Sequence, residues 1–427
     1  MGTVSHGRHR PRTARSVLLL ATAAAAATVL VACSSTTSTP QSSTPTASSS
    51  STSSAAASVD PAALAATIKK FFLTDIDPTT LDPVVLRTMD IASRPWTDAN
   101  QATLMNCLKN DVCQTGTGGL TIGFPNDNIN PWRQMFRAEM DAQAIQSGQV
   151  SKIIYSLSPD VAGWLANVKS MIAQKPDVMV IDSIYGPAIL PVVQQAKAAG
   201  IVVVEAETPL PPSVSGVVDA QATSDLCAFY NDAAGRAAKL VPSSGTYGLY
   251  TGVPGNGSAA VWQPCLTKSI ESAGFKQVIQ GFTQWTPQGM TQQGTALYAS
   301  GKNPSVVAYD YTMEYFAAPF LKDGKTPPIM VSDVINTAYL QQSKAASDKG
   351  VKVQGFVANG RSWYGRIGLT AGLMIKSGEK VNQQITIPYP ASSLDQILPS
   401  FDATMPANAP VPVGFDAAQT AAILSAG

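Results

Sequence analysis

Short apolar segments alternate with longer helical patterns from residue 119 to residue 357 of this 427-residue chain. Helical patterns cover 132–147, 160–174, 187–199, 258–273 and 287–300. The segments between and around them have the length and composition of buried strands: 119–124, 151–155, 177–182, 201–205, 216–219, 246–251, 277–281, 305–310, 328–332 and 352–357. Strands that alternate with helices form parallel sheets covered on both faces. Two runs of about five strands therefore predict an α/β fold with two such sheets.

The N-terminus has the layout of an export signal. Four arginines and no acid lie in residues 1–15, and an apolar segment follows over 16–32. The segment ends in Leu30-Val31-Ala32-Cys33, which resembles the bacterial lipobox, where the cysteine becomes the lipidated first residue. The apolar run is short for a span of about 20 residues. We therefore expect a lipoprotein signal peptide over 1–33 with lipidation at Cys33; a transmembrane anchor, or a cleaved peptide with a chance cysteine, is the alternative.

Residues 34–58 are almost entirely Ser, Thr, Ala and Pro. Such a segment has little apolar surface to bury and is expected to be a disordered tether. A flexible chain of this length reaches roughly 25–30 Å. The predicted protein is thus exported and held by its lipid on the extracytoplasmic face of the cell membrane.

Composition excludes several function classes. Residues 1–33 hold four of the 29 basic residues and no acid, so 25 basic and 28 acidic residues remain, a net charge of about −3. A nucleic-acid partner is not expected, because it requires a basic surface. Both histidines, His6 and His9, also lie in the signal, which excludes Ser-His-Asp and Cys-His catalysis and His-ligated metal sites in the mature chain.

Four cysteines follow Cys33, an even number that favours disulfides in an exported protein: Cys107, Cys113, Cys227 and Cys265. Three pairings are possible, and we favour Cys107–Cys113 with Cys227–Cys265. A zinc site is the weaker alternative, because the chain has no CxxC and the mature part has no histidine.

Residues 59–118 predict a helical N-terminal extension. Asp60-Pro61 and Asp82-Pro83 each combine an N-cap with proline at the first helical position, and a third helix is expected over 97–109. Packing of this extension on the main body is the simpler interpretation, and docking to a partner is the alternative.

Polar and aromatic residues follow most of the predicted strands. In an open α/β sheet, a ligand binds outside the carboxyl ends of the strands. Carboxylates and amides pair with adjacent hydroxyls, and aromatic faces cover the C–H side of a sugar ring. The candidate ligand-binding residues are Asn130, Trp132, Glu205, Glu207, Trp285, Asp310, Asp333, Asn359 and Arg361. Taken singly, each tryptophan could instead be a packing residue, and Asp310 and Asp333 could be helix caps.

The glycine-rich segment 252–258 lies between a predicted strand and a predicted helix. It lacks the Gly-Lys-Ser/Thr of a nucleotide-binding loop, so a tight turn is expected.

Several motifs in order along the chain resemble one known family. They are Thr121-Ile122-Gly123-Phe124 with Asn130-Pro131-Trp132; Lys175-Pro176-Asp177; Ala198-Ala199-Gly200-Ile201; and Asn303-Pro304-Ser305. The chain resembles, over roughly residues 119–390, the type I periplasmic binding proteins of sugar ABC transporters, of the ribose-binding kind. The resemblance implies two Rossmann-like lobes joined by three crossovers, near 220–223, 358–361 and 387–391, with the ligand bound between the lobes. One lobe would comprise 119–222 with 360–388, and the other 223–359 with 389–415.

The resemblance also implies roles for the candidate residues. Asn130 and Trp132 match the first ligand-binding loop, and Trp285 matches an aromatic wall. Glu205 or Glu207, Asp333, and Asn359 or Arg361 match polar contacts, while Asp310 stands where the family often has Asn.

The chain departs from the family pattern in two places. Glu205-Ala206-Glu207-Thr208 replaces an acid–arginine pair, and Trp262-Gln263 stands where an arginine is expected. These departures favour an amino-substituted, cationic or bulkier ligand over a common pentose or hexose.

The leading hypothesis is a monomeric solute-binding protein without cofactor or catalytic activity. It would close its lobes on a small polar ligand and deliver that ligand to an ABC transporter permease. A sensory subunit of the same fold is the alternative. A carboxylate-dependent glycosidase using Asp310 and Asp333 is a more distant one.

Overall fold

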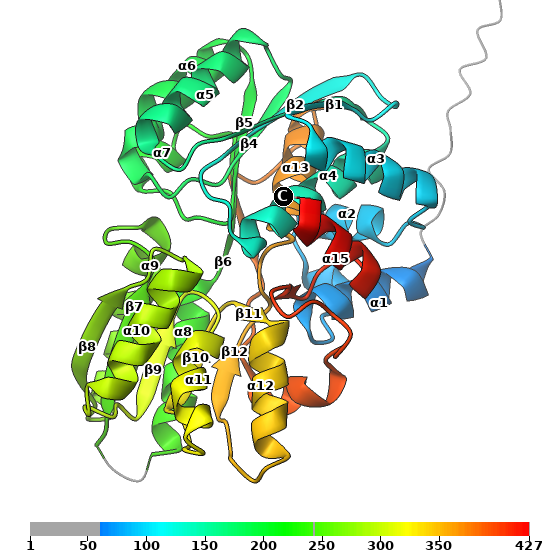
Figure 1. The fold of residues 1–427 in the computed structure, drawn as a ribbon. Coiled ribbons are helices and arrows are strands. Elements are labelled where there is room, and N and C mark those ends of the chain that lie inside the picture. Colours follow the sequence, from blue (N-terminus) through cyan, green and yellow to red (C-terminus); the bar gives the residue numbers. More distant parts are fainter. Residues whose placement is uncertain (1–59, 242–243, 427) are drawn as a thin grey trace, which may run out of the picture. The chain divides into compact units, whose positions relative to one another are not determined.

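The computed structural model describes residues 60–241 and 244–426. The predicted signal peptide, the tether and Cys33 lie outside the described residues. Two mixed, mainly parallel sheets form the framework, and Figure 1 shows each with its helices.

The first sheet has seven strands in the order β1-β3-β2-β4-β5-β6-β13. All neighbours are parallel except β1, which pairs antiparallel with β3. The strands are β1 (Val112–Gln114), β2 (Leu120–Asn126), β3 (Val150–Leu157), β4 (Val178–Ile181), β5 (Val202–Ala206), β6 (Ala220–Ser224) and β13 (Gln384–Ile387). The helices of this lobe are α4 (Pro131–Ser147), α5 (Val161–Ala173), η2 (Gly186–Ile189), α6 (Leu190–Ala198), α7 (Pro212–Ser215) and α13 (Tyr364–Lys376).

Strand β4 shows how the sequence builds this lobe. Val178 and Val180 face one side and belong to the cluster that includes α4 and α13, whereas Met179 and Ile181 face the cluster that includes α5 and α6. Side chains on both faces are apolar because both faces are covered by helices. Helix α13 approaches the sheet closely at Gly372, where a Cβ would lie 2.3 Å from a methyl carbon of Val178.

The second sheet has six strands in the order β14-β12-β10-β9-β7-β8, parallel except for β14. The strands are β7 (Thr246–Thr251), β8 (Lys276–Phe282), β9 (Val306–Tyr309), β10 (Ile329–Ser332), β12 (Gly355–Val357) and β14 (Ser392–Ser393). Helices α8 (Leu226–Lys239) and α9 (Gly257–Ser272) share one core cluster with the sheet. The opposite face contributes to a cluster with α10 (Pro287–Ala299), α11 (Glu314–Lys322) and α12 (Thr337–Ser347). Short helices α14 (Leu394–Ile397) and η3 (Leu398–Ser400) follow β14.

The chain passes between the lobes three times in the family manner: from β6 to α8, from β12 to α13, and from β13 to β14. The predicted two-lobe α/β fold class is confirmed. The chain then returns to the first lobe once more. Strand β15 (Pro410–Val411) pairs with β11 (Ile335–Asn336) of the second lobe, and α15 (Ala417–Ala426) packs on α4 of the first lobe. Figure 1 shows this C-terminal helix in red beside α3.

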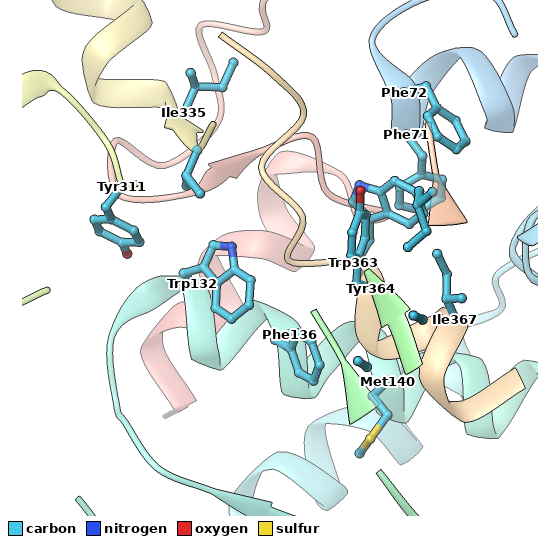
Figure 2. Close-up of a cluster of buried hydrophobic side chains, with 14 of the residues drawn as sticks. Phe71, Phe72, Trp132, Phe136, Met140, Tyr311, Ile335, Trp363, Tyr364 and Ile367 are labelled. Atoms are coloured by element: carbon cyan, nitrogen blue, oxygen red, sulfur yellow. The ribbon is translucent and has the colours of Figure 1, made fainter. Parts of the chain in front are cut away.

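The N-terminal extension folds as predicted into helices α1 (Pro61–Phe72), α2 (Pro83–Ala92) and α3 (Asp98–Lys109), with a short turn η1 (Pro78–Thr80) between the first two. Asp60 and Asp82 cap α1 and α2 by accepting hydrogen bonds from the backbone N–H groups of Ala62 and Val84. Phe71 and Phe72 pack on Trp363 at the start of α13, as Figure 2 shows. The extension is thus part of the packed body of the first lobe.

One expected strand was wrong. Residues 216–219 form a turn, and the strand β6 comes after them, at 220–224. The apolar pair Val217-Val218 resembles a strand in composition but lies in the turn after α7. The strand itself, Ala-Gln-Ala-Thr-Ser, has weak strand propensity and is held by its neighbours β5 and β13.

Two disulfides join the pairs that the sequence favours. Cys107–Cys113 ties α3 to β1, and Cys227–Cys265 ties α8 to α9. In the described part of the chain, no helix combines the length and apolarity needed to span a membrane.

Candidate functional site

A cavity, partly open to solvent, lies where the carboxyl ends of the strands of both sheets meet. Its walls come from both lobes and combine amide, aromatic, carboxylate and guanidinium groups. The lining residues are Asn128, Asn130, Trp132, Arg133, Ile184, Glu207, Thr208, Asn256, Ser258, Trp285, Asp310, Tyr311, Val334 and Arg361.

The first-lobe wall is built on the loop between β2 and α4. Asn130 is the N-cap of α4, and its side-chain oxygen accepts a hydrogen bond from the Arg133 backbone N–H at 2.9 Å. Trp132 lies against Phe136, one helical turn later, and its indole N–H donates to the Gly360 carbonyl at 2.5 Å. Figure 2 shows this arrangement, with the indole in the hydrophobic cluster that also contains Tyr311 and Ile335. Trp132 therefore connects the cavity wall to the second crossover.

Arg133 is held by two buried carboxylates. It forms an ion pair with Asp127 at 3.0 Å and a second, shorter one with Asp182. Burial raises the pKa of both acids, and the nearby Arg133 opposes that rise. The pKa of Arg133 is raised by the same neighbours against the effect of burial, so the guanidinium stays charged.

The second-lobe wall centres on Asp310, which follows β9. Its carboxylate accepts hydrogen bonds from the Thr251 hydroxyl at 2.5 Å, the Trp285 indole at 3.1 Å and the Trp262 indole at 3.3 Å. Burial raises the pKa of Asp310 to about 6, and these hydrogen bonds limit the rise. Three donors from three different elements hold the carboxylate in one orientation.

The position of Trp285 depends on Gly252. The indole lies directly over this glycine at the end of β7, where a Cβ would be 1.9 Å from a ring carbon. Gln284 and Trp285 have φ angles of 56° and 50°, in the left-handed region that non-glycine residues seldom adopt. The absence of a side chain at Gly252 and the left-handed turn at Gln284 and Trp285 together orient this indole toward Asp310.

Arg361 joins the two lobes behind the cavity. This residue of the second crossover forms an ion pair with Glu207, which follows β5. It forms a second ion pair, at 2.8 Å, with Asp333, which follows β10. Burial raises the pKa of Asp333 to about 7 although Arg361 lowers it. The Tyr389 hydroxyl, from the third crossover, donates to the backbone carbonyls of Asp333 and Asn359. One ion-pair network thus connects both lobes and two crossovers.

The lobes also meet directly across the cavity. Gly257, the first residue of α9, packs against Pro209 of the first lobe, where a Cβ would lie 2.4 Å from the Pro209 carbonyl oxygen. Tyr311 of the second lobe lies in the same hydrophobic cluster as Trp132 of the first lobe. These contacts form when the lobes are closed on one another.

Six of the nine candidate residues come together at the cavity: Asn130, Trp132, Glu207, Trp285, Asp310 and Arg361. The other three, Glu205, Asp333 and Asn359, are buried and do not line it. Glu205 lies within β5, where both carboxylate oxygens lack hydrogen-bond partners among the described residues, and burial raises its pKa well above the usual value. Asp333 and Asn359 instead support Arg361, by an ion pair and by accepting its backbone N–H.

Several lining residues were not predicted as ligand contacts, among them Arg133, Thr208, Asn256 and Ser258. Asn256 could have been recognised from the sequence, because it lies in the glycine-rich turn directly before α9. Its side-chain oxygen caps α9 by accepting a hydrogen bond from the Ala259 backbone N–H. Arg133 could have been recognised as well, because it lies in the first turn of α4, three residues after the cap Asn130.

The arrangement suits binding more than catalysis. Asp333 does not line the cavity, so Asp310 and Asp333, the pair named in the glycosidase alternative, do not both face it. Within residues 60–241 and 244–426, no group of three or more His, Cys, Asp or Glu is placed to hold a metal ion.

Solved structures similar to this chain share its fold. An ABC transporter solute-binding protein from Bacillus halodurans with bound myo-inositol aligns with a TM-score of 0.58 and 17% identity, over 67% of this chain and 99% of that one. A Mycobacterium smegmatis protein in complex with β-D-fucofuranose aligns with a TM-score of 0.57 and 19% identity, over 66% and 95%. The arabinose-transporter binding protein from Shewanella sp. ANA-3, bound to L-arabinofuranose, aligns with a TM-score of 0.57 and 17% identity, over 64% of this chain and 92% of that one.

A comparison with curated protein sequences found no match. A comparison with family models found one: the periplasmic binding protein domain matches residues 122–380, which include every lining residue of the cavity and most strands of both sheets. The chain belongs to the periplasmic binding protein domain family.

Proposed function

We propose that the protein is a lipid-anchored, extracytoplasmic solute-binding protein that captures a small polar, sugar-like ligand and delivers it to an ABC transporter permease. The observation that carries the proposal is the cavity between the lobes, lined from both sides by Asn130, Trp132, Trp285, Asp310 and Arg361. The family binds solutes and is not catalytic, so the function requires capture and release alone.

The chemistry of the walls supports a hydroxylated ligand. Asp310 and Asn130 provide oxygen acceptors, and Arg133 and Arg361 provide N–H donors, so hydroxyl groups find both kinds of partner. Trp132 and Trp285 provide flat apolar faces for ring carbons. The similar solved proteins from Bacillus halodurans and Mycobacterium smegmatis hold myo-inositol and β-D-fucofuranose, which are ligands of this kind.

Capture proceeds by closure of the two lobes. The ligand contacts groups from both lobes, so it stabilises the arrangement in which Gly257 meets Pro209 over an open one. Release to a permease requires those contacts to separate again.

A thermal-shift screen of the purified protein against sugars, polyols, amino sugars, nucleosides and polyamines tests ligand capture. Saturating ligand at 100 times its Kd adds about 2.7 kcal/mol of stability, a readily measured shift. Calorimetry on a stabilising compound should show at least about a tenfold loss of affinity in Trp285→Ala. Phe282→Ala removes an exposed aromatic three residues earlier and should bind normally. No stabilisation by any compound would contradict the proposal.

The lipid anchor and the transport role are tested in the host cell. Labelled palmitate should enter the wild-type protein and not Cys33→Ser, which should leave the membrane fraction. Uptake of the identified ligand should fail in a strain lacking the protein. Uptake that persists unchanged would favour the sensory alternative.

A further inference from the structure

Six carboxyl groups and two guanidinium groups surround the cavity. The acids are Asp127, Asp182, Glu205, Glu207, Asp310 and Asp333, and every one is buried. Among the described residues, the cations that act on them are Arg133 and Arg361. The site therefore has more acidic than basic groups, in a region where water does not screen them.

Both cations are already engaged by protein carboxylates. Arg133 pairs with Asp127 and Asp182, and Arg361 pairs with Glu207 and Asp333. Among the ion pairs of the described residues, neither guanidinium contacts Asp310 or Glu205.

Among the described residues, Asp310 is the cavity-lining carboxylate that no cation contacts. Its three partners, Thr251, Trp262 and Trp285, are neutral donors, and Arg361 acts on it only weakly and from a distance. A buried carboxylate that lacks an opposite charge is costly unless a partner provides one. The opening of the cavity gives a ligand access to this group.

A second observation points to a hydroxyl on the same ligand. Arg361 lines the cavity, is 3% exposed, and has an Nε–H group without a hydrogen-bond acceptor among the described residues. A neutral oxygen would satisfy it without adding to the acid excess.

We propose that the cavity selects an aminated polyol, such as an amino sugar, whose ammonium group pairs with Asp310 while a hydroxyl oxygen accepts from Arg361. The inference rests on the proposed function, because it names the ligand class of the same cavity. Asp310 is thus the residue that determines specificity for charge.

The test uses matched ligands that differ in one group: D-glucosamine against D-glucose, D-galactosamine against D-galactose, and the N-acetylated amines as neutral controls. Calorimetry on the full-length protein at about pH 7.5 should show at least one amine binding about tenfold or more tightly than its hydroxyl counterpart. The advantage of the amine should shrink at about pH 5, below the Asp310 pKa of about 6.

Asp310→Asn keeps the shape and one acceptor oxygen but removes the charge. It should lower the affinity for the amine at least about tenfold more than it lowers the affinity for the matched neutral sugar, because only the amine loses a charged partner. Asp348→Asn removes an exposed carboxylate far from the cavity wall, paired with Lys344, and should change neither affinity.

The outcomes separate the two proposals. Equal or tighter binding of the neutral sugar would overturn the amine inference and leave solute capture intact. Failure of every compound would contradict both. If Asp310→Asn does not fold, the amine–hydroxyl comparison and its pH dependence in the wild-type protein still decide the question.

Discussion

The α-carbon of Gly257 in the second lobe faces the backbone carbonyl oxygen of Pro209 in the first, with space for a hydrogen and none for a methyl group: a Cβ would lie 2.4 Å from that oxygen. A side chain at residue 257 would therefore hold the two lobes apart.

Gly257→Val is expected to keep the lobes apart without disturbing either core. Ligand affinity should fall by at least about tenfold, because closure then costs free energy that the ligand must supply. Small-angle scattering with saturating ligand should show a larger radius of gyration than wild type. Gly235→Ala, where a Cβ meets nothing nearer than 3.6 Å, is the control. Normal affinity in Gly257→Val would refute the role of this contact.

Gly252→Ala should displace the Trp285 indole, since the added Cβ would occupy a position 1.9 Å from a ring carbon. The displaced ring can no longer donate to Asp310. We expect a loss of roughly 1–3 kcal/mol in stability from overpacking, and weaker ligand binding. Tryptophan fluorescence should shift as the indole moves. Unchanged fluorescence and affinity would show that the loop adapts at no cost.

The free energy of unfolding of the ligand-free protein should decrease as the pH rises from about 4 to about 8. Burial raises the pKa of Asp310 to about 6 and of Asp333 and Asp141 to about 7, and raises that of Glu205 well above its usual value. When the pKa of an acid is higher in the folded state than in the unfolded state, its contribution to stability is fully present below the unfolded-state pKa. That contribution is lost as the pH rises through the folded-state pKa.

Thermal melts at about pH 5 and pH 8 check this expectation, with the higher Tm at pH 5. Glu205→Gln removes one proton-linked group and should make the dependence shallower. A Tm that rises with pH over this window would mean that the ion pairs with Arg133 and Arg361 outweigh burial.

The two disulfides should contribute unequally. Cys227–Cys265 closes a loop of 38 residues and Cys107–Cys113 one of six. Chain entropy predicts stabilisation of about 4 and about 2 kcal/mol respectively. Denaturant unfolding of Cys227→Ser/Cys265→Ser and of Cys107→Ser/Cys113→Ser measures both. A larger loss from the shorter loop would show that local packing of α3 on β1 dominates.

Local sequence patterns were sufficient to predict the fold class and most of the helices and strands. Strands such as 246–251 and helices such as 287–300 are readable because apolar periodicity and caps are local properties. The caps at Asp60 and Asp82 were correctly placed for the same reason. Family motifs then placed Asn130, Trp132, Trp285 and Asp310 at strand ends, where both sheets direct their loops to one cavity.

Tertiary structure alone decided which strand-end acids line the cavity and which are buried behind it. Glu205 and Glu207 are two residues apart, yet one lies buried in β5 and the other reaches Arg361 at the cavity wall. The pairing of Arg133 with Asp127 and Asp182, and of Arg361 with Glu207 and Asp333, joins residues from separate segments. Such pairs depend on how loops from different strands meet in space, and local sequence patterns contain no information about that distance.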